Sequence, residues 1–246
     1  TTFWGSRGNW PGNILPTAAD DVRTPEGSTV VINSFNSQLQ GYIEGIGQAN
    51  YLNAAGSVVV GLGSALLVRS ADIANLTLSG LLASDGLVNV GSYAGALGQL
   101  TGSGTTRVQA VADRFFTLRV AGGHRLEFSG SFAGDTDIEV VEKSTFVNDG
   151  SFSSADRGTH EFLLYGQSTF VNRAMLGAGT DRLSVVGSGT FNPSTQSRVL
   201  NQGTVESGFS FSGTRFDNDG LVRVRAGQSF SALFNGNRSV LVFFDD

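Results

Sequence analysis

Phe146-Val147-Asn148-Asp149-Gly150 is the first of four related pentapeptides in this chain. The others are Phe170-Val171-Asn172-Arg173-Ala174, Val199-Leu200-Asn201-Gln202-Gly203 and Phe216-Asp217-Asn218-Asp219-Gly220. Their Asn residues lie 24, 29 and 17 positions apart. Alternating residues followed by Asn-x-Gly are typical of a strand that ends in a turn. Irregular repeats of this length predict a coiled sheet, in which each repeat forms one coil and buries its apolar face on its neighbours.

The composition fits many short strands joined by tight turns. Hydrophobic residues make up 40% of the 246 residues, charged residues only 15%, and Gly outnumbers Pro by 34 to 4. This mixture is too apolar for a disordered chain and lacks the period of collagen. The sequence therefore predicts an all-β protein, a single right-handed parallel β-helix (β-solenoid).

The N-terminal segment differs from the rest and predicts an atypical cap over residues 1–32. It contains both tryptophans, Trp4 and Trp10, and three of the four prolines. The exposed ends of a solenoid core are usually covered by atypical terminal units. Residues 33–246 then form the solenoid, with a narrow Ala/Leu/Val core to about residue 114 and a wider Phe-rich core from about residue 115.

The repeated Asn is in phase with the apolar residue two positions before it, so both side chains point to the same side of the strand. Two structural interpretations remain open. Inward Asn side chains stack as a ladder through successive coils, or each Asn supplies a turn residue at the end of its strand. The ladder would consist of Asn148, Asn172, Asn201 and Asn218.

The net charge, the absence of cysteine and the start of the chain limit the classes of protein to which this sequence can belong. The net charge of −5 gives no basic footprint for nucleic acid. Cysteine is absent, which leaves neither disulfides nor thiol chemistry. The chain begins Thr1-Thr2 and holds its single Met at position 175, so we expect that a secretory signal peptide has been removed and that the protein is extracellular or on the cell surface. No apolar run approaches the ~20 residues that span a membrane.

Candidate chemical groups are few, and we predict no catalytic residues and no cofactor. Asp135, Asp137 and Glu139 would share the solvent side of one strand, near His124-Arg125. Such a row fits glycosidase carboxylates or a calcium site, but it is also an ordinary solvated face. The pair Asp20-Asp21 is a weak calcium candidate. The alternative to a non-enzymatic protein is therefore a carbohydrate-active or glycan-binding β-helix: a lyase, a hydrolase or a spike-like protein.

The last strand is the strongest candidate for self-association. The run from Val240 to Phe244 is apolar on both faces. The end of a solenoid is an unpaired sheet edge to which another chain can add. We expect the strand either to pack under its own fold or to dock on a second copy. The candidates for contacts between copies are Trp4, Trp10, Val240, Val242, Phe243 and Phe244.

The opening of the chain carries a resemblance. It reads Asn9-Trp10-x-Gly12-x-x-x-Pro16-x-x-x-Asp20-Asp21-Val22, then Gly27-x-x-Val30-x-Ile32. Together with the Phe-x-Asn-x-Gly repeats it resembles secreted bacterial β-helix exoproteins, such as autotransporter passengers and filamentous-haemagglutinin-like adhesins. The resemblance implies export and a role in adhesion, surface coating or fibre building. As partners we expect copies of the chain itself and, for the glycan-binding alternative, surface glycans.

Overall fold

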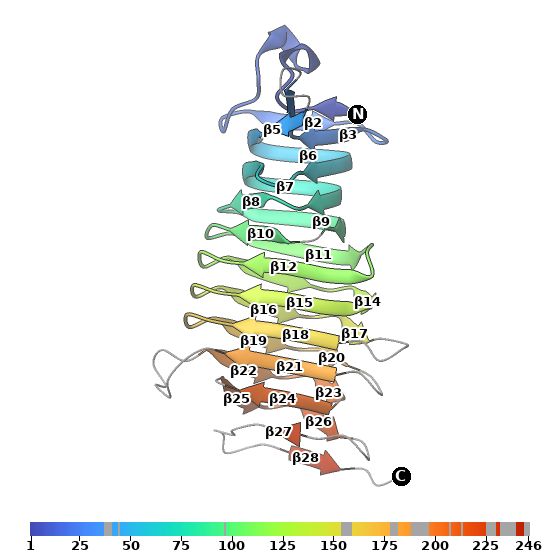
Figure 1. Cartoon of the computed structure of the whole chain (residues 1–246), viewed down its shortest axis with the longest axis vertical. Coiled ribbons are helices and arrows are strands. Elements are labelled where there is room, and N and C mark those ends of the chain that lie inside the picture. Colours follow the sequence, from blue (N-terminus) through green and yellow to red (C-terminus); the bar gives the residue numbers. More distant parts are fainter. Residues whose placement is uncertain are drawn as a thin grey trace.

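The chain forms a tall stack of β-coils, shown from the side with its long axis vertical in Figure 1, in a computed structural model of the whole sequence. The structure describes residues 1–36, 41–43, 45–95, 97–153, 159–177, 182–187, 197–206, 208–212, 214–224, 230–231 and 240–243. Strands of successive coils pair in parallel, which confirms the predicted all-β solenoid. No helix in this described part is long and apolar enough to cross a membrane.

Each coil from β6 to β26 contributes one strand segment to each of three faces, always in the same order. Face 1 contains the first parts of β6 (Ile46–Val60) and β7 (Ala65–Leu78), then β8 (Leu81–Ser84), β10 (Gly98–Thr101), β12 (Phe115–Val120), β15 (Asp135–Val140), β18 (Thr159–Leu164), β21 (Arg182–Gly187), β24 (Gly208–Ser212) and β27 (Phe230–Ser231).

Face 2 carries the repeated pentapeptides. It contains β2 (Asp21–Thr24), the middle of β6 and β7, the first parts of β9 (Leu87–Ala94) and β11 (Thr105–Val111), then β13 (Arg125–Phe128), β16 (Thr145–Asn148), β19 (Thr169–Asn172), β22 (Arg198–Asn201) and β25 (Arg215–Asn218).

Face 3 closes each coil. It contains β1 (Thr2–Phe3), β3 (Thr29–Ile32) and the ends of β6, β7, β9 and β11. It continues below β11 as β14 (Ser131–Ala133), β17 (Ser151–Ser153), β20 (Met175–Leu176), β23 (Thr204–Glu206), β26 (Leu221–Val224) and β28 (Val240–Phe243).

The N-terminal segment differs from the prediction in where the solenoid begins. Both β2 and β3 pair in parallel with β6, so regular coiling starts inside residues 1–32 rather than after them. The irregular cap includes two short 3₁₀ helices, η1 (Arg7–Asn9) and η2 (Pro11–Asn13), and rises above the stack in Figure 1. An antiparallel hairpin, β4 (Ser34–Asn36) with β5 (Gly41–Ile43), interrupts the passage from β3 to β6 and has no counterpart in the sequence prediction.

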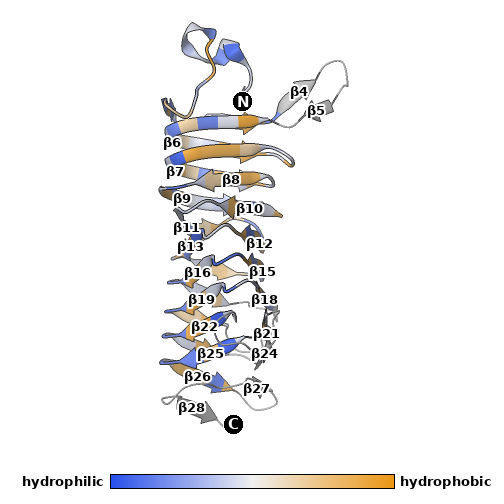
Figure 2. Ribbon diagram, turned by 90° about the vertical axis from the view of Figure 1, so that its left-hand side faces the viewer, coloured by the Kyte–Doolittle hydropathy of each residue, from blue (hydrophilic) through white to orange (hydrophobic). Residues whose placement is uncertain are grey.

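Alternate residues of the strands point inward and form the core. The first coils bury mainly aliphatic side chains, and apolar colouring follows β6, β7 and β8 in Figure 2. From Phe116 to Phe170 seven buried Phe side chains join the aliphatic residues of the core, and Phe216 follows further along the stack. Phe170 stacks on Phe146, with ring centroids 5.2 Å apart, and on Phe162 of face 1, at 4.5 Å. Buried apolar residues from Trp4 to Val224 belong to a single cluster, so one continuous core runs through the change from aliphatic to aromatic filling.

Glycine after the repeated Asn lets successive coils approach closely. A Cβ added to Gly150, Gly203 or Gly220 would lie 2.0, 2.2 or 2.2 Å from a carbonyl oxygen of the coil before. One coil has Ala174 at this place, and there the following bond, from Met175 N to Gly150 O, is 3.3 Å. The equivalent bonds in neighbouring coils measure 2.8, 2.7 and 2.9 Å. The close spacing between successive coils therefore explains why glycine, which has no Cβ, stands at this position.

Candidate functional site

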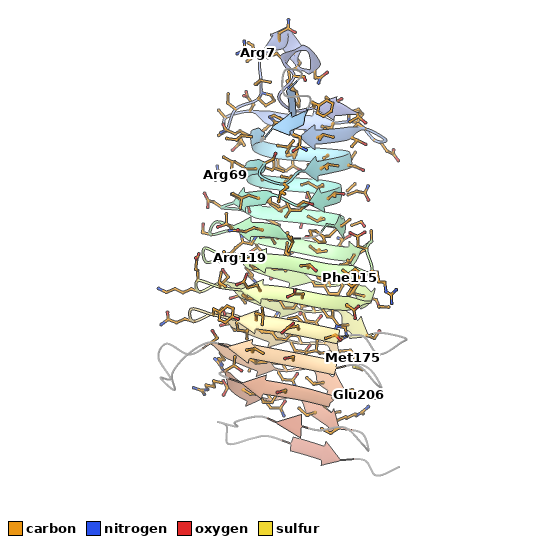
Figure 3. All side chains as sticks on the ribbon, viewed as in Figure 1. Arg7, Arg69, Phe115, Arg119, Met175 and Glu206 are labelled. Atoms are coloured by element: carbon orange, nitrogen blue, oxygen red, sulfur yellow. The ribbon has the colours of Figure 1, made fainter. Side chains whose placement is uncertain are left out.

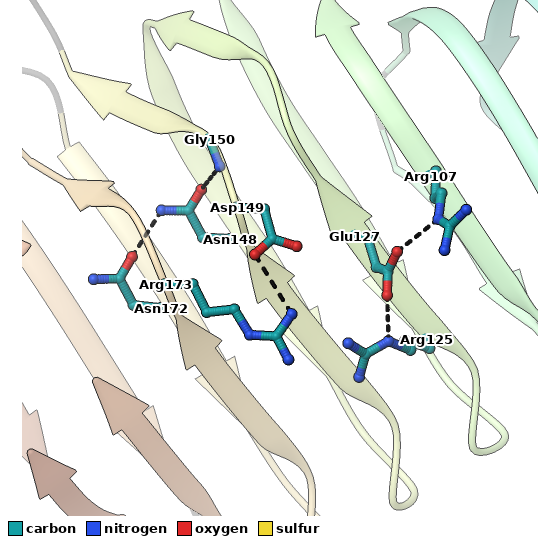
Figure 4. A network of polar contacts seen from close by, with 8 residues as sticks. All are labelled: Arg107, Arg125, Glu127, Asn148, Asp149, Gly150, Asn172 and Arg173. Atoms are coloured by element: carbon teal, nitrogen blue, oxygen red, sulfur yellow. Dashed lines mark hydrogen bonds and ion pairs between the residues drawn. The ribbon is translucent and has the colours of Figure 1, made fainter. Parts of the chain in front are cut away.

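The four repeated Asn residues form a continuous ladder inside the solenoid, as the inward alternative predicts. Asn148 Nδ2 donates to Asn172 Oδ1 at 2.8 Å, Asn172 Nδ2 to Asn201 Oδ1 at 2.7 Å, and Asn201 Nδ2 to Asn218 Oδ1 at 2.6 Å. The amides also bond backbone at the turn, for example Gly150 N to Asn148 Oδ1 at 3.0 Å (Figure 4). All four side chains are buried, so the ladder has no free surface for a ligand.

The Asn ladder replaces an apolar row of the earlier coils. The residue directly before Asn148 in this register is Phe128, preceded by Val108, Val90 and Ile73. The same inward position is thus filled by hydrocarbon in one half of the stack and by hydrogen-bonded amides in the other. Buried amides are stable only when their hydrogen bonds are made. The ladder therefore specifies the coil register more strictly than the apolar row does.

A second polar row lies at the corner between faces 1 and 2, and the sequence analysis missed it. Ser144, Ser168, Ser197 and Thr214 precede successive face 2 strands and are all buried. Ser168 Oγ lies 3.3 Å from Ser197 Oγ, and Ser144 Oγ accepts from Gly123 N at 3.1 Å. The signal was present in the sequence: Ser or Thr stands two residues before the apolar member of each repeat. The full repeat is therefore Ser/Thr-x-apolar-x-Asn.

His124 occupies this corner row in the coil before Ser144. Its side chain is buried, and its Nε2 lies 2.9 Å from Thr106 Oγ1 of the preceding coil. Burial lowers its pKa to about 4, against weaker opposing effects from the backbone of Gly102 and Thr101 and from Asp85. The imidazole is therefore neutral at pH 7 and points into the core.

The acidic row on β15 faces solvent as predicted, but His124 and Arg125 do not converge on it. Asp137 is exposed, Asp135 Oδ1 accepts from Thr159 N at 2.8 Å, and Glu139 pairs with Arg119 at 3.1 Å. Arg125 begins β13 on face 2, whereas β15 belongs to face 1. His124 is inside the coil. These residues do not form the single groove that a glycosidase or lyase requires.

Face 2 carries its own charged clusters. Arg107 and Arg125 hold Glu127 between them, with N–O distances of 2.7 and 2.6 Å (Figure 4). Burial raises the pKa of Glu127, but the two arginines outweigh it and the net pKa is lowered. Arg198 and Arg215 hold Asp217 in the same way further along the stack. Each carboxylate uses its two oxygens on two arginines, which is typical of structural ion pairs.

The two tryptophans lie at the N-terminal end of the stack, where they cover the core. Trp4 is only 1% exposed and packs over Gly47 of β6, where an added Cβ would lie 3.1 Å from the indole. Trp10 is half-buried, donates from Nε1 to Trp4 O at 2.7 Å, and its ring lies 5.1 Å from that of Trp4. Trp4 is thus inaccessible to a partner unless the cap moves, whereas Trp10 keeps a solvent-exposed side.

Asp20 and Asp21 have protein partners. Asp20 Oδ2 accepts from Thr17 N at 2.8 Å and from Thr17 Oγ1 at 2.7 Å, and these bonds lower the pKa of Asp20. Asp21 Oδ1 accepts from Asn50 Nδ2 at 2.9 Å. Within the described residues, no group of three or more metal-ligating side chains gathers here or elsewhere. The calcium hypothesis therefore gains no support from this arrangement.

In the described part of the chain, two hollows lie at or next to the cap. The first, of about 410 Å³, lies between Trp10 and β2, and its walls are Trp10, Pro11, Ile14, Leu15, Pro16 and residues 20–23. The second, of about 390 Å³, lies at the corner between faces 1 and 2, with Arg69 and Asp85 among its lining residues. Arg69 projects from the side of the stack in Figure 3, and Arg7 projects from the cap above it.

The predicted C-terminal strand is present as β28. Its backbone pairs in parallel with β26, from Leu221 with Val240 to Val224 with Phe243. It therefore continues face 3 of its own fold, one of the two expected placements. The side chains of Val240, Val242 and Phe243, and all of Phe244, lie outside the described residues.

Comparison with protein-family models, with curated proteins and with solved structures finds no match for the chain.

Proposed function

We propose that this chain is a non-enzymatic structural or adhesive rod that works outside the cell and associates with copies of itself. The observation that carries the proposal is the direction in which the side chains of the repeat point. Its apolar, Asn and Ser/Thr side chains all point inward and bond or pack from coil to coil. The repeated residues therefore build length and stiffness, as in a quasi-one-dimensional scaffold.

The C-terminal end of the stack is the better candidate for self-association. In the described residues, β27 and β28 each pair with one strand only, β24 and β26. An exposed strand edge offers unpaired N–H and C=O groups to another chain. The N-terminal end is closed by Trp4, which the cap covers. We therefore place the contact between copies at β28 rather than at Trp4.

Sedimentation of the purified chain over a wide concentration range, with electron microscopy of the same samples, tests this proposal. We expect rods that associate as concentration rises, and a variant lacking residues 240–246 that remains a single rod. Circular dichroism and Trp fluorescence confirm that the truncated chain still folds. A chain that stays monomeric at high concentration, whether or not residues 240–246 are present, contradicts the proposal.

A carbohydrate-active β-helix is the competing function. Its enzymatic form relies on Asp135, Asp137 and Glu139, which lie on an outer face away from His124. Activity on acidic polysaccharides, lost in an Asp137→Ala variant, would nevertheless favour it over the structural role.

A further inference from the structure

The hollow between the cap and β2 combines an aromatic wall with a charged rim. Of its lining residues, Trp10, Pro11, Ile14, Leu15 and Pro16 are apolar, and Asp20, Asp21 and Arg23 are charged. Its volume of about 410 Å³ lies within the range of about 300–1,000 Å³ for small-ligand sites. Apolar walls with a few placed polar groups are the usual composition of such sites.

The aromatic wall is rigid before any ligand arrives. The bond from Trp10 Nε1 to Trp4 O fixes the plane of the indole, and Trp4 itself is locked in the core. η2 begins at Pro11, directly after Trp10, and proline restricts the backbone there. A wall that needs no ordering upon binding favours affinity, because the entropic cost of immobilising it has already been met in folding.

The two carboxylates of the charged rim are also held in place. Asp21 and Arg23 are the outward residues of β2, alternating with buried Val22 and Thr24. Asp21 is bonded to Asn50, and Thr17 holds Asp20 through a single carboxylate oxygen. The lowered pKa of Asp20 keeps that carboxylate ionised at neutral pH. The rim therefore presents fixed carboxylate acceptors beside a guanidinium donor.

We propose that this hollow binds a neutral sugar residue at the end or within the chain of an oligosaccharide. The C–H face of a pyranose is complementary to the electron-rich face of an indole. Its neighbouring hydroxyls both donate and accept, which matches carboxylates next to an arginine. Two carboxylates against one arginine disfavour an acidic sugar. This inference goes beyond the structural role and does not depend on self-association.

The test uses the intact chain and a panel of neutral oligosaccharides of gluco, galacto, manno and N-acetyl types. Uronate oligosaccharides and a trimethylammonium compound represent the competing ligand chemistries. The chain has two tryptophans, and Trp4 is buried, so ligand-induced fluorescence change reports on Trp10. Saturation-transfer NMR gives an independent measure of binding.

Substitutions on the exposed rim distinguish a specific binding site from non-specific binding. We expect Arg23→Ala and Asp21→Asn each to weaken binding about tenfold, the equivalent of one lost hydrogen-bonding interaction. Trp10→Ala should abolish binding, and Trp10→Phe should restore part of it. Arg7→Ala, an arginine of the same cap outside the hollow, is the matched control and should leave binding unchanged.

Three results would overturn the proposal. The first is that no neutral oligosaccharide in the panel binds the unaltered chain. The second is that the trimethylammonium compound or a uronate oligosaccharide binds in preference, which would make Trp10 a cation site or the rim an anion site. The third is that Arg7→Ala weakens binding as much as Arg23→Ala does. Thermal unfolding of each variant confirms that the cap remains folded.

Discussion

Replacing Asn172 by Ala removes an internal member of the Asn ladder. Asn172 accepts from Asn148 Nδ2 at 2.8 Å and donates to Asn201 Oδ1 at 2.7 Å. It also donates weakly to the backbone oxygens of Ala174 and Thr204, at 3.3 and 3.2 Å. The change therefore breaks the ladder in the middle, and it leaves two buried amides facing a gap.

The expected loss of stability is about 3 kcal/mol. Asn201 Oδ1 loses its ladder donor, which costs about 1–3 kcal/mol for a buried polar atom. Asn148 keeps a bond to Met175 O at 3.0 Å, so its loss is smaller, about 1 kcal/mol. Asn218 is the last described member of the ladder, and within the described part of the chain it accepts from Asn201 alone, so Asn218→Ala should cost about half as much.

Denaturant titration followed by circular dichroism measures the total change. Because repeat proteins open in parts, hydrogen exchange should be read coil by coil as well. The most informative amide is Thr204 N, which bonds Ala174 O at 2.7 Å beside the ladder. We expect faster exchange there in Asn172→Ala, and little change in β9 or β11.

A leucine at the same place separates a hydrogen-bonded ladder from simple space filling. Val90 and Val108 occupy this register in earlier coils, so the solenoid accommodates apolar side chains there. If the row only fills space, Asn172→Leu will be as stable as the unaltered chain. That result, or a double-mutant cycle of Asn172 and Asn201 with no coupling energy, would refute the ladder as a source of stability.

Three further predictions each concern the substitution of one residue. Gly203→Ala should destabilise the chain by about 1–3 kcal/mol in denaturant titration, because its Cβ would press on a carbonyl 2.2 Å away, whereas Ala174→Gly should cost less or stabilise. The pKa of His124 is lowered to about 4, below its ordinary value of 6.5, so the unfolded chain binds the proton more readily. Stability should therefore fall by on the order of 3 kcal/mol as pH drops from about 6.5 to about 4, and a pH series should lose this slope in His124→Ser, the residue that other coils use. Trp4→Ala should open the cap at a cost of about 3–5 kcal/mol to its local stability, seen as a red shift of the Trp10 emission relative to Trp4→Phe, and equal emission of the two variants would contradict the capping role.

The inward ladder was predictable because a strand has a period of two. Phe146 and Asn148 are two positions apart, so the apolar residue and the amide must share a face. The start of the solenoid was not predictable in the same way. β2 pairs with a segment 30 residues later, Asp21 with Tyr51, and nothing in residues 21–24 themselves specifies that partner. Because both tryptophans lie in residues 1–32, the sequence predicts a longer cap than the chain has.

At the candidate sites, too, strand alternation predicts some side-chain directions, whereas others depend on turns that the alternation does not specify. Alternation along β15 was enough to place Asp137 on the solvent side. The inward direction of His124 depends on the corner before β13, where two glycines have positive φ, at 68° and 81°. The hollow beside Trp10 depends on a turn that brings residue 10 next to residues 20–23. Neither arrangement follows from strand periodicity.

The number of residues per coil varies, whereas the bond lengths of the Asn ladder hardly do. This contrast shows which parts of the chain can change in length. Successive ladder residues are 24, 29 and 17 positions apart, yet their bonds measure 2.8, 2.7 and 2.6 Å. The intervals between described strands differ in length: β17 ends at Ser153 and β18 begins at Thr159, whereas β21 ends at Gly187 and β22 begins at Arg198. Lengthening a surface connection costs little free energy, because loop-closure entropy grows slowly with length. The strands of each coil and the buried corner residues are constrained by their stacked neighbours, whereas the length of the connections between strands is not. Binding specificity in a rod of this kind should therefore reside at its corners and ends, and the hollow beside Trp10 is at such an end.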